Sequence, residues 1–487
     1  MADDDLSGIV LWDAAELSTA IRGKTVSCVE VMTAYLDRID EINPKVNAIV
    51  SRRPRAVLLA EAAEKDRLLR TGEYQGWMHG FPHAVKDLAD VAGLPTTYGF
   101  VRGALAPADA LFVERIRAAG AIFIGKTNTP QFGLGSHTYN DVFGTTLNAY
   151  DQTRSAGGSS GGAAVAVALR MVPVADGSDF MGSLRNPPGW NNVFGLRPSV
   201  GRVPDYGGEL FVSQAGVIGP IARTATDLAL LLETMSGYDD RCPLSLAQPA
   251  RFATDLDAPV RGKKVAWLGD LGGYLPMEPE VLRVTGAALT SFTALGMTVT
   301  ALDGLPASGT FEGNASLWPT WLVLRHWLAG MAVKDTYDIP AARALMKPEA
   351  VYEVEGLLNH IDGVAVHQAN QARSGLYEGF RRLFQTYDYI ALPTAQVMPF
   401  DATLHWPAAI GDTAMSSYHR WMEVTTISTL INAPTLAMPA GFGVTGLPIG
   451  LQIIGPNHGE SGLLALARAW ERQTGFVRNR PPSLLLR

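Results

Sequence analysis

The sequence predicts an α/β fold, with a mixed β-sheet at the centre and α-helices covering both of its faces. Three observations predict this fold class. Short apolar runs such as residues 121–124 (AIFI) and 389–392 (YIAL) have the length and composition of buried strands. Amphipathic helical patterns alternate with these runs, and Gly-rich turns separate the two between about residues 80 and 227. Strands and helices that alternate in this way are typical of a sheet with helices on both faces.

Residues 1–75 are predicted to be helical and to wrap the outside of a larger body. Ser27 and Glu30 form a capping box, which marks the start of a helix. Apolar residues then recur at helical spacing: Val29, Met32, Leu36 and Ile39. We expect this helix to end at Pro44, and a second helix to span residues 54–69.

Residues 76–235 form the predicted core, with a helix at 110–119, a strand at 121–124 and a buried helix at 163–169. Residues 300–385 differ, because they are rich in helix formers and carry three tryptophans at near-helical spacing: Trp318, Trp321 and Trp327. These rings either pack in the core or form an aromatic wall over a substrate pocket. No internal repeat divides the chain, so we expect residues 1–487 to form a single domain in which 300–385 is a variable, substrate-binding helical insertion.

Composition and charge exclude several classes of protein. Hydrophobic residues make up 47% and charged residues 18% of the 487 positions, which is typical of a soluble globular protein. The net charge is -7, and the basic residues are scattered, the nearest thing to a cluster being Arg381 and Arg382. A nucleic-acid surface needs clustered positive charge, so we expect no nucleic-acid partner.

We expect a cytoplasmic enzyme without a membrane span, a metal or another cofactor. No apolar run reaches the roughly 18 residues of a spanning helix, and the longest, residues 161–175, contains Arg170. Residues 1–5 (MADDD) are acidic and lack the plan of a signal peptide. Cys28 and Cys242 alone make neither a disulfide framework nor a zinc site.

The densest chemical signal is the run of glycine and serine at residues 157–162 (GGSSGG), directly before an apolar helix. Glycines let the backbone approach a ligand closely, and serines add hydroxyl groups. The run also satisfies the nucleophile-elbow pattern G-x-S-x-G with Ser159 at its centre. That alternative needs a strand before the elbow and a histidine base. Residues 151–154 (DQTR) make a poor strand, and none of the nine histidines stands in a context that marks it as a base.

Residues 120–127 (GAIFIGKT) match the P-loop expression of nucleotide-binding proteins. In a P-loop the middle residues form a loop around phosphate, whereas here they are the predicted strand. Lys126 would stand at the end of that strand, before residues that favour a turn. We therefore interpret this match as a coincidence.

Three segments together resemble the amidase signature family: residues 80–87 (GFPHAVKD), 157–162 (GGSSGG) and 178–185 (SDFMGSLR), the last continuing through 195–199 (GLRPS). Ser159 and Ser183 are separated by 183 − 159 = 24 residues, as in the family pattern. Similar segments extend over most of the chain and are weakest between about 240 and 385. The resemblance implies the amidase signature fold for residues 1–487.

The resemblance implies a role for each matching residue. Ser183 would attack the amide carbonyl and become acylated. Ser159, after a cis peptide bond from Gly158, would connect this nucleophile to Lys86, the base. A lysine can accept a proton near neutral pH only where burial or hydrogen bonding disfavours its charged form. A serine hydroxyl is in turn a poor nucleophile until a neighbour takes its proton.

Further residues would support the catalytic set. The oxyanion hole would consist of backbone N–H groups from the segment of the nucleophile: Phe180, Met181, Gly182 and Ser183. Supporting residues would be Gly158, Ser160, Asp179 and Arg185, where Asp179 and Arg185 either brace the loop as an ion pair or have no catalytic part. The sequence departs from the family pattern in four places: the bulky Phe180-Met181 pair, Gln131 in place of a glutamate, Ala149 in place of a proline, and residues 187–192 (PPGWNN) beyond the shared proline.

The implied function is hydrolysis of a C–N acyl bond in a small, apolar or aromatic substrate, by a monomer or homodimer. The substrate would be an amide, an anilide or a carbamate (urethane), with esters as a side activity. One alternative is the A subunit of a tRNA-dependent glutamine amidotransferase, which Met422 disfavours, while the neighbouring Glu423 keeps it open. Another alternative is a catalytically silent binding protein on the same fold.

Overall fold

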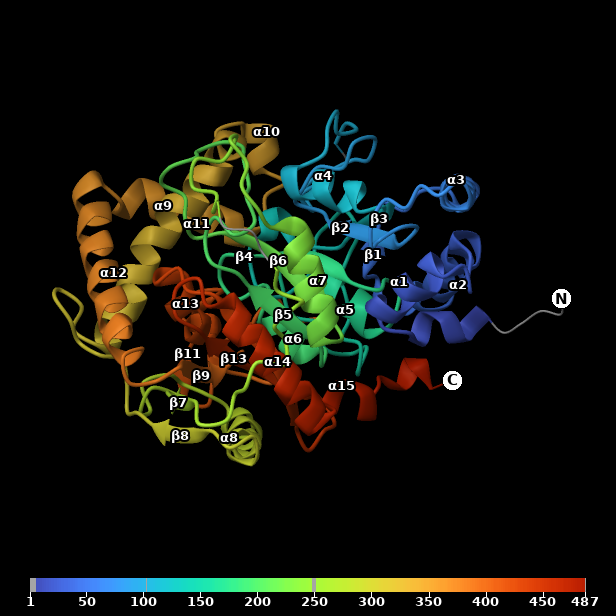
Figure 1. Ribbon diagram of the computed structural model, residues 1–487. Helices are drawn as coiled ribbons and strands as arrows, with labels where there is room; N and C mark the ends of the chain where they lie inside the picture. Colours follow the sequence, from blue (N-terminus) through green and yellow to red (C-terminus); the bar gives the residue numbers. More distant parts are fainter. Residues whose placement is uncertain (1–5, 102, 248–250, 487) are drawn as a thin grey trace.

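Eight strands form the central sheet of the computed structural model, which describes residues 6–101, 103–247 and 251–486 (Figure 1). The order of the strands is β4-β6-β5-β12-β13-β9-β7-β8. Neighbours are antiparallel from β4 to β9 and parallel from β9 to β8, so the sheet is mixed as predicted. The bounds are β4 Ala175–Asp179, β5 Phe194–Arg197, β6 Val217–Ala222, β7 Lys264–Trp267, β8 Thr298–Ala301, β9 Tyr389–Pro393, β12 Thr435–Phe442 and β13 Pro448–Ile454.

A smaller sheet of three strands lies beside β4, in the order β1-β3-β2. Its strands are β1 Ile49–Val50, β2 Pro82–Lys86 and β3 Ile122–Thr127. β2 and β3 are parallel, and the backbone N–H of Lys86 at the end of β2 donates to Asp176 in β4 at 3.1 Å. This contact joins the two sheets at the position where the predicted base leaves its strand. A short hairpin of β10 Ala409–Ile410 and β11 Thr413–Ala414 completes the strands.

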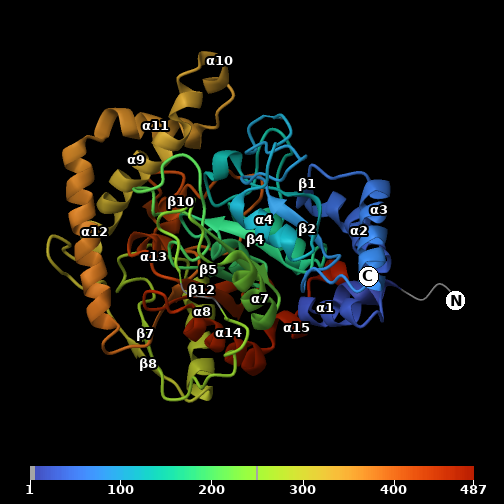
Figure 2. The same ribbon diagram turned by 45° about the horizontal axis from the view of Figure 1, so that its top comes forward.

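Helices surround the central sheet. In Figure 1 α7 and α14 pass in front of the central strands, and α1–α3 lie at the right. α9, α11 and α12 group at the left in Figure 1 and in Figure 2, with α10 at the top of both views. Their bounds are α1 Ala14–Arg22, α2 Cys28–Val46, α3 Arg55–Arg70, α4 Leu111–Ala118, α5 Gly161–Ala168, α6 Asn186–Trp190, α7 Ala225–Met235, α8 Pro279–Ala294, α9 Leu317–Tyr337, α10 Pro340–Arg343, α11 Pro348–His360, α12 Gly363–Leu383, α13 Thr426–Leu430, α14 Glu460–Thr474 and α15 Phe476–Asn479.

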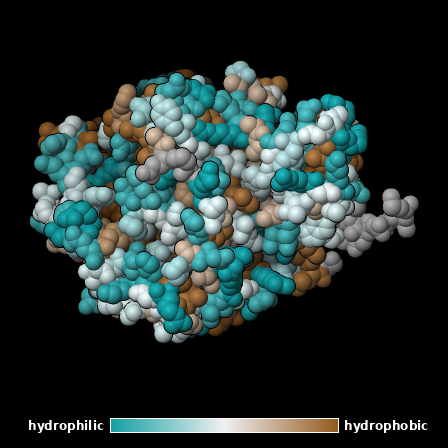
Figure 3. All heavy atoms as spheres, in the orientation of Figure 1, coloured by the Kyte–Doolittle hydropathy of each residue, from teal (hydrophilic) through white to brown (hydrophobic). Residues whose placement is uncertain are grey.

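The surface in Figure 3 mixes hydrophilic and hydrophobic residues over the visible face. Across the described ranges, none of the helices combines the length and the apolar character that a membrane crossing requires. The acidic residues 1–5, which lack the plan of a signal peptide, lie outside the described residues.

The predicted capping box is present, but the helix it starts is longer than expected. Ser27 Oγ accepts the N–H of Glu30 at 3.1 Å, and a carboxylate oxygen of Glu30 accepts the N–H of Ser27 at 2.7 Å. α2 then passes Pro44 and ends at Val46, where Asn47 adopts a left-handed conformation. The expected end at Pro44 was therefore wrong. In the last turn of a helix a proline removes only one hydrogen bond, which the packing of the apolar face outweighs.

The helix after the Gly-rich run is buried on all sides. Every residue of α5 Gly161–Ala168 is buried, which explains why this helix is apolar all round. A Cβ atom at Gly162 would stand 2.4 Å from the backbone nitrogen of Asn128, so only glycine fits there. The run is therefore a packed turn, which brings the backbone of residues 157–160 close to β2 and β4.

The segment that matches the P-loop expression is a strand, as the sequence predicts. β3 includes Lys126, whose Nζ donates to the carbonyl of Ala89 and lies 3.7 Å from Asp87. An extended strand cannot wrap its N–H groups around a phosphate. Likewise, residues 151–154 form a turn and not the strand that a nucleophile elbow requires.

Candidate active site

One amino group and two hydroxyl groups, from three separate segments, form one hydrogen-bonded chain. Lys86 Nζ donates to Ser159 Oγ at 2.8 Å, and Ser159 Oγ donates to Ser183 Oγ at 3.0 Å. The backbone N–H of Ser159 also donates to Ser183 Oγ, at 2.8 Å. The three residues are 2%, 4% and 7% exposed, so the chain is almost completely shielded from solvent. The structure thus brings together the three residues that the sequence predicts as catalytic.

Burial makes Lys86 suitable as a base. Desolvation lowers the pKa of its ammonium to about 7, although the charges of Asp176 and Asp179 act in the opposite direction. Lys86 Nζ also donates to Ser160 Oγ at 2.9 Å and to Ser178 Oγ at 3.0 Å. A neutral amine is therefore accessible near pH 7, and it is held in place by neutral hydroxyl groups.

The peptide bond between Gly158 and Ser159 is cis, as the resemblance implied. A Cβ atom at Gly158 would lie 2.9 Å from the backbone nitrogen of His137 and 3.0 Å from the carbonyl oxygen of Gly135. A side chain is therefore excluded at position 158. This close backbone packing places the hydroxyl of Ser159 between Lys86 and Ser183.

Asp179 organises the loop that carries Ser183. Its carboxylate binds Arg185 through two hydrogen bonds of 2.9 Å, and it accepts the N–H of Gly182 at 2.9 Å and of Leu184 at 3.0 Å. Arg197 donates to the backbone carbonyl of Asp179 at 2.6 Å. Burial alone would raise the pKa of Asp179, but Arg185 and Arg197 hold it well below its usual range. The ion pair between Asp179 and Arg185, whose role the sequence left open, therefore stabilises the loop that carries Ser183.

Replacing Asp179 with alanine is expected to destabilise the protein by about 3–5 kcal/mol, because Arg185 and Arg197 would remain buried without their partner. Both arginines are fully buried. Urea unfolding of the variant measures this loss. Glu378→Ala, which breaks an exposed pair with Arg381, is the control and should change stability much less. Equal effects of the two substitutions would contradict the central role of Asp179.

Several backbone N–H groups near Ser183 have no hydrogen-bond acceptor among the described residues. Thr429 Oγ1 donates to the carbonyl of Phe180 at 2.7 Å, and Thr425 Oγ1 donates to that of Met181 at 3.2 Å. The N–H of Gly182 is taken by Asp179. In the part of the chain that the structure describes, the N–H groups of Phe180, Met181 and Ser183 donate to no protein acceptor. These three groups are free to bind a negatively charged oxygen.

Aromatic side chains line the approach to the nucleophile. The ring of Phe180 meets that of Trp321 edge to face, with centroids 5.8 Å apart. The guanidinium of Arg325 lies 4.8 Å from the Phe180 ring and is held by Glu353 at 3.0 Å. Trp318 and Trp321 are both buried, so core packing accounts for them. Trp321 in addition supports the wall beside Ser183.

Lys86, the predicted base, lines a cavity of about 620 Å³ together with Asp176 and Ser178 of β4. Asp90, Asp109 and Asp205 line the same cavity. Across residues 6–101, 103–247 and 251–486, no group of three or more His, Cys, Asp or Glu side chains is arranged to hold a metal ion.

Histidines near the site serve other partners. His83 Nε2 lies 3.0 Å from Asp176, and His137 Nδ1 lies 2.7 Å from Ser155 Oγ. Among the described side chains, no histidine hydrogen-bonds to Ser159 or Ser183. A nucleophile elbow with a histidine base is therefore not present around Ser159.

Comparisons with known proteins show the family of this chain. A model of the family described as Amidase matches residues 30–464. The chain belongs to the amidase signature family. It is 33% identical to an acylamidase of Rhodococcus erythropolis, over 97% of this chain and 98% of the relative. It is also 33% identical to the A subunit of the glutamyl-tRNA(Gln) amidotransferase of Thermosynechococcus vestitus, over 96% and 98% of the two chains.

Solved structures show the same fold. A bacterial aryl acylamidase of the amidase signature family superimposes with a TM-score of 0.87 at 29% identity, over 96% of this chain and 99% of that chain. A peptide amidase from Stenotrophomonas maltophilia gives a TM-score of 0.77 at 28% identity, over 96% and 98% of the chains. The protein is thus an amidase signature hydrolase of C–N bonds.

Three residues of this amidase signature site were given no role from the sequence. Asp176 receives the backbone N–H of Lys86, Ser178 contacts its amine, and Arg197 binds Asp179. Asp176 and Ser178 alternate along β4, which places both side chains on the same face of the strand. Two polar residues at alternate positions of a strand that leads into the segment of Ser183 were the signal from which a role for Asp176 and Ser178 could have been predicted. Arg197 stands in the segment 195–199 that resembles the family, but its partner, 18 residues away, could not be read from that segment.

Proposed function

We propose that the protein hydrolyses small amides or carbamates through an acyl-enzyme on Ser183, with Ser159 as proton relay and Lys86 as base. The observation that carries this proposal is the continuous hydrogen-bonded chain from Lys86 Nζ through Ser159 Oγ to Ser183 Oγ. A serine becomes nucleophilic when a neighbour accepts its proton. A buried amine with a pKa of about 7 is such an acceptor at neutral pH.

The reaction proceeds in two stages. Ser183 Oγ attacks the carbonyl carbon as its proton passes to Ser159, whose own proton passes to Lys86. The oxyanion that forms accepts N–H groups from Phe180, Met181 and Ser183, whereas Gly182 keeps its bond to Asp179. The C–N bond then breaks, and the departing nitrogen takes the proton back from Lys86 through Ser159. A water molecule then attacks the Ser183 ester as its proton passes through Ser159 to Lys86. The ester C–O bond breaks, Ser183 Oγ takes the proton back through Ser159, and the acid is released.

The substrate we propose carries an apolar or aromatic group beside the scissile bond. Phe180 and Met181 precede Ser183 in the same loop and pack with Trp321 in one apolar cluster. Arg325, the charged group beside Phe180, is paired with Glu353. An acylamidase and an aryl acylamidase are among the similar proteins. The departures from the family pattern at Phe180 and Met181 therefore shape the pocket. Esters and carbamates (urethanes) present the same carbonyl to Ser183, so we include them as alternative substrates.

A second candidate function is glutamine hydrolysis as the A subunit of an amidotransferase. Identity to several such subunits, 33% in Thermosynechococcus vestitus, favours it. That function requires an acidic side chain free to bind the amino group of glutamine. Glu423 accepts the hydroxyl of Tyr274 at 3.0 Å and lies 3.1 Å from Arg420, while Met422 is buried in the core. Because Glu423 is buried between Tyr274 and Arg420, although its Oε2 accepts no hydrogen bond among the described residues, we favour an apolar amide over glutamine.

A substrate panel tests the proposal. The purified protein is assayed with a chromogenic anilide, a primary aryl amide, an aryl carbamate, an aryl ester and glutamine, and Ser183→Ala is the control for background hydrolysis. We expect turnover of aryl amides, anilides or carbamates above the control and no ammonia from glutamine. Glutaminase activity of the isolated chain would favour the amidotransferase function. Binding without turnover of any compound would favour a silent binding protein.

A further inference from the structure

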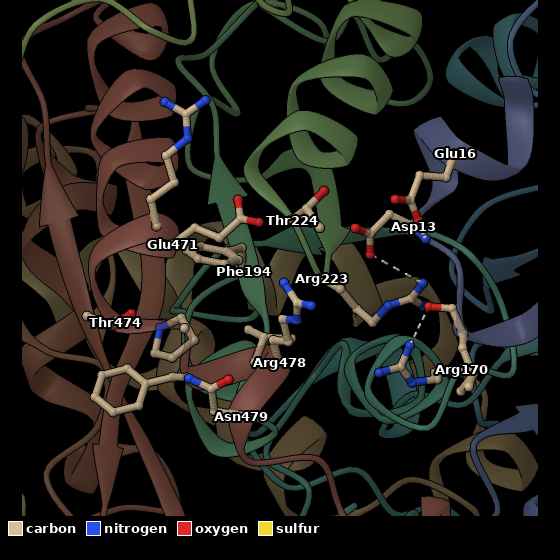
Figure 4. Close-up of a pocket in the computed structure, with 16 residues that line it drawn as sticks. Asp13, Glu16, Arg170, Phe194, Arg223, Thr224, Glu471, Thr474, Arg478 and Asn479 are labelled. Atoms are coloured by element: carbon tan, nitrogen blue, oxygen red, sulfur yellow. Dashed lines mark hydrogen bonds and ion pairs between the residues drawn. The ribbon is translucent and has the colours of Figure 1, made fainter.

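Four arginines line one cavity of about 910 Å³ (Figure 4), and one of them, Arg472, forms an ion pair with Asp257 at 2.6 Å. Arg170 follows α5, Arg223 lies between β6 and α7, and Arg478 belongs to α15. Asp13 at the start of α1 and Glu471 of α14 border the same cavity. The walls therefore bring together the N-terminal helices, the central sheet and the C-terminal helices.

Buried guanidinium groups at this cavity have donors without acceptors. Arg223 is 3% exposed, and its Nη2 donates to the carbonyl of Trp12. Its Nε and Nη1, and Nε of Arg170, are buried without a hydrogen-bond partner among the described residues. The nearest carboxylate oxygen, Oδ1 of Asp13, lies 3.9 Å from Nη2 of Arg223, which is too far for a hydrogen bond. Unpaired buried donors are costly, so a ligand that accepts from them would be stabilised.

The acidic neighbours do not satisfy the arginines, because they have other partners. Glu471 accepts the backbone N–H of Ala225 at 2.9 Å and lies 3.7 Å from Arg468. Glu16 accepts the backbone N–H of Asp13 at 3.0 Å. Arg478 is exposed and makes neither a hydrogen bond nor an ion pair with any residue in the described ranges. Positive charge at the cavity is thus left partly uncompensated.

Repulsion between the arginines adds to this imbalance. Figure 4 shows the guanidinium of Arg223 between Asp13 and Arg170. Burial and the neighbouring charge of Arg223 lower the pKa of Arg170 to about 10. An anion in the cavity would relieve this repulsion and supply the missing acceptors at once.

The cavity is separate from the catalytic residues. β6 pairs Val217 with Asp179 beside the nucleophile loop, and it runs from there to Ala222, directly before Arg223. A strand advances about 3.3 Å per residue, so Arg223 lies about 20 Å from the catalytic end of β6. The two sites sit at opposite ends of the same strand.

We propose that this cavity is a second binding site, which holds a small molecule through an oxyanion group, either a phosphate or a carboxylate. The planar fork of a guanidinium matches both groups, and several guanidinium groups around one cavity favour a doubly charged anion. Among these arginines Arg478 is exposed, Arg170 is partly buried and Arg223 is buried, so the charged group of the ligand would be held between Arg170 and Arg223.

Calorimetric titration of Ser183→Ala with inorganic phosphate, and separately with succinate, tests this site without interference from catalysis. Sodium chloride of matched ionic strength controls for simple screening. We expect saturable binding of one of the anions, and the tighter of the two identifies the group. Arg478→Gln, introduced into Ser183→Ala, should raise the Kd about tenfold or more, because a charge-assisted hydrogen bond is lost.

Two further variants make the test specific. Arg223→Lys keeps the charge but loses the fork, and it should weaken binding as much as Arg478→Gln does. Arg480→Gln is the matched control, because Arg480 is exposed, two residues from Arg478, and stacks on Phe442. It should leave the Kd unchanged. Absence of saturable binding at millimolar anion, or equal weakening by Arg480→Gln and Arg478→Gln, would overturn the proposal. Arg478→Gln alone decides the outcome if Arg223→Lys does not fold.

Discussion

Replacing Lys86 with alanine is expected to lower kcat/KM by about a thousandfold or more, since the base that accepts the proton of Ser183 is lost. Lys86→Arg should not restore activity, because arginine stays protonated throughout the accessible pH range. Steady-state kinetics with the best aryl amide of the panel measures both variants. Circular dichroism confirms that each is folded.

The lysine base also predicts how kcat/KM changes with pH. Burial lowers the pKa of Lys86 from 10.5 to about 7, and only the neutral amine accepts a proton. Activity should therefore be full above that pKa and should fall about tenfold per pH unit well below it. The acid limb of kcat/KM should have its midpoint near pH 7. This limb belongs to the free enzyme, so it reports Lys86 before the substrate binds.

Histidine variants are the matched controls for the lysine. His83 and His137 are the buried histidines that lie nearest to the catalytic loops, and both have partners other than the two serines. Folded His83→Gln and His137→Gln should keep most of the activity and the same acid limb. If one of the folded histidine variants is inactive while Lys86→Ala keeps nearly wild-type activity, the base is that histidine and not Lys86.

Ser183→Ala is expected to lower kcat by about 10⁶-fold, because no other group can carry the acyl chain. A fluorophosphonate probe should label the wild-type protein at Ser183 and leave this variant unlabelled, which peptide mass spectrometry reads directly. Ser159→Ala should also be severely impaired, because the proton path to Lys86 is broken. It should keep Ser183 as the site of any residual labelling.

The neighbouring Ser160 provides the control for these substitutions. Ser160 Oγ lies 2.9 Å from Lys86 Nζ, but it does not contact Ser183. Ser160→Ala should therefore cost far less activity than Ser159→Ala, although the two serines are adjacent. Labelling at Ser159 in the wild type would identify Ser159, and not Ser183, as the nucleophile.

The mixed sheet could be predicted from the sequence, and so could the three residues that the structure brings together as the candidate catalytic set, because both depend on local signals. Apolar runs such as 121–124 and 389–392 became the strands β3 and β9. Lys86, Ser159 and Ser183 stand in short motifs whose residue types are those that an acyl transfer needs. Hydrophobic periodicity and turn residues are recognised within a few positions of the sequence, so they can be used without knowledge of the fold.

What the tertiary structure decided is how distant residues meet and how burial changes them. Lys86 and Ser159 are 73 positions apart, and nothing in either motif states that Nζ and Oγ stand 2.8 Å apart. The same holds for Arg197 beside Asp179, and for the arginines of the second cavity. A pKa depends on desolvation and on charges within a few ångströms, which come from segments far apart in the chain. The sequence by itself therefore determined which groups are available for the proposed chemistry, and only three-dimensional packing decided that Lys86 is buried, which lowers its pKa.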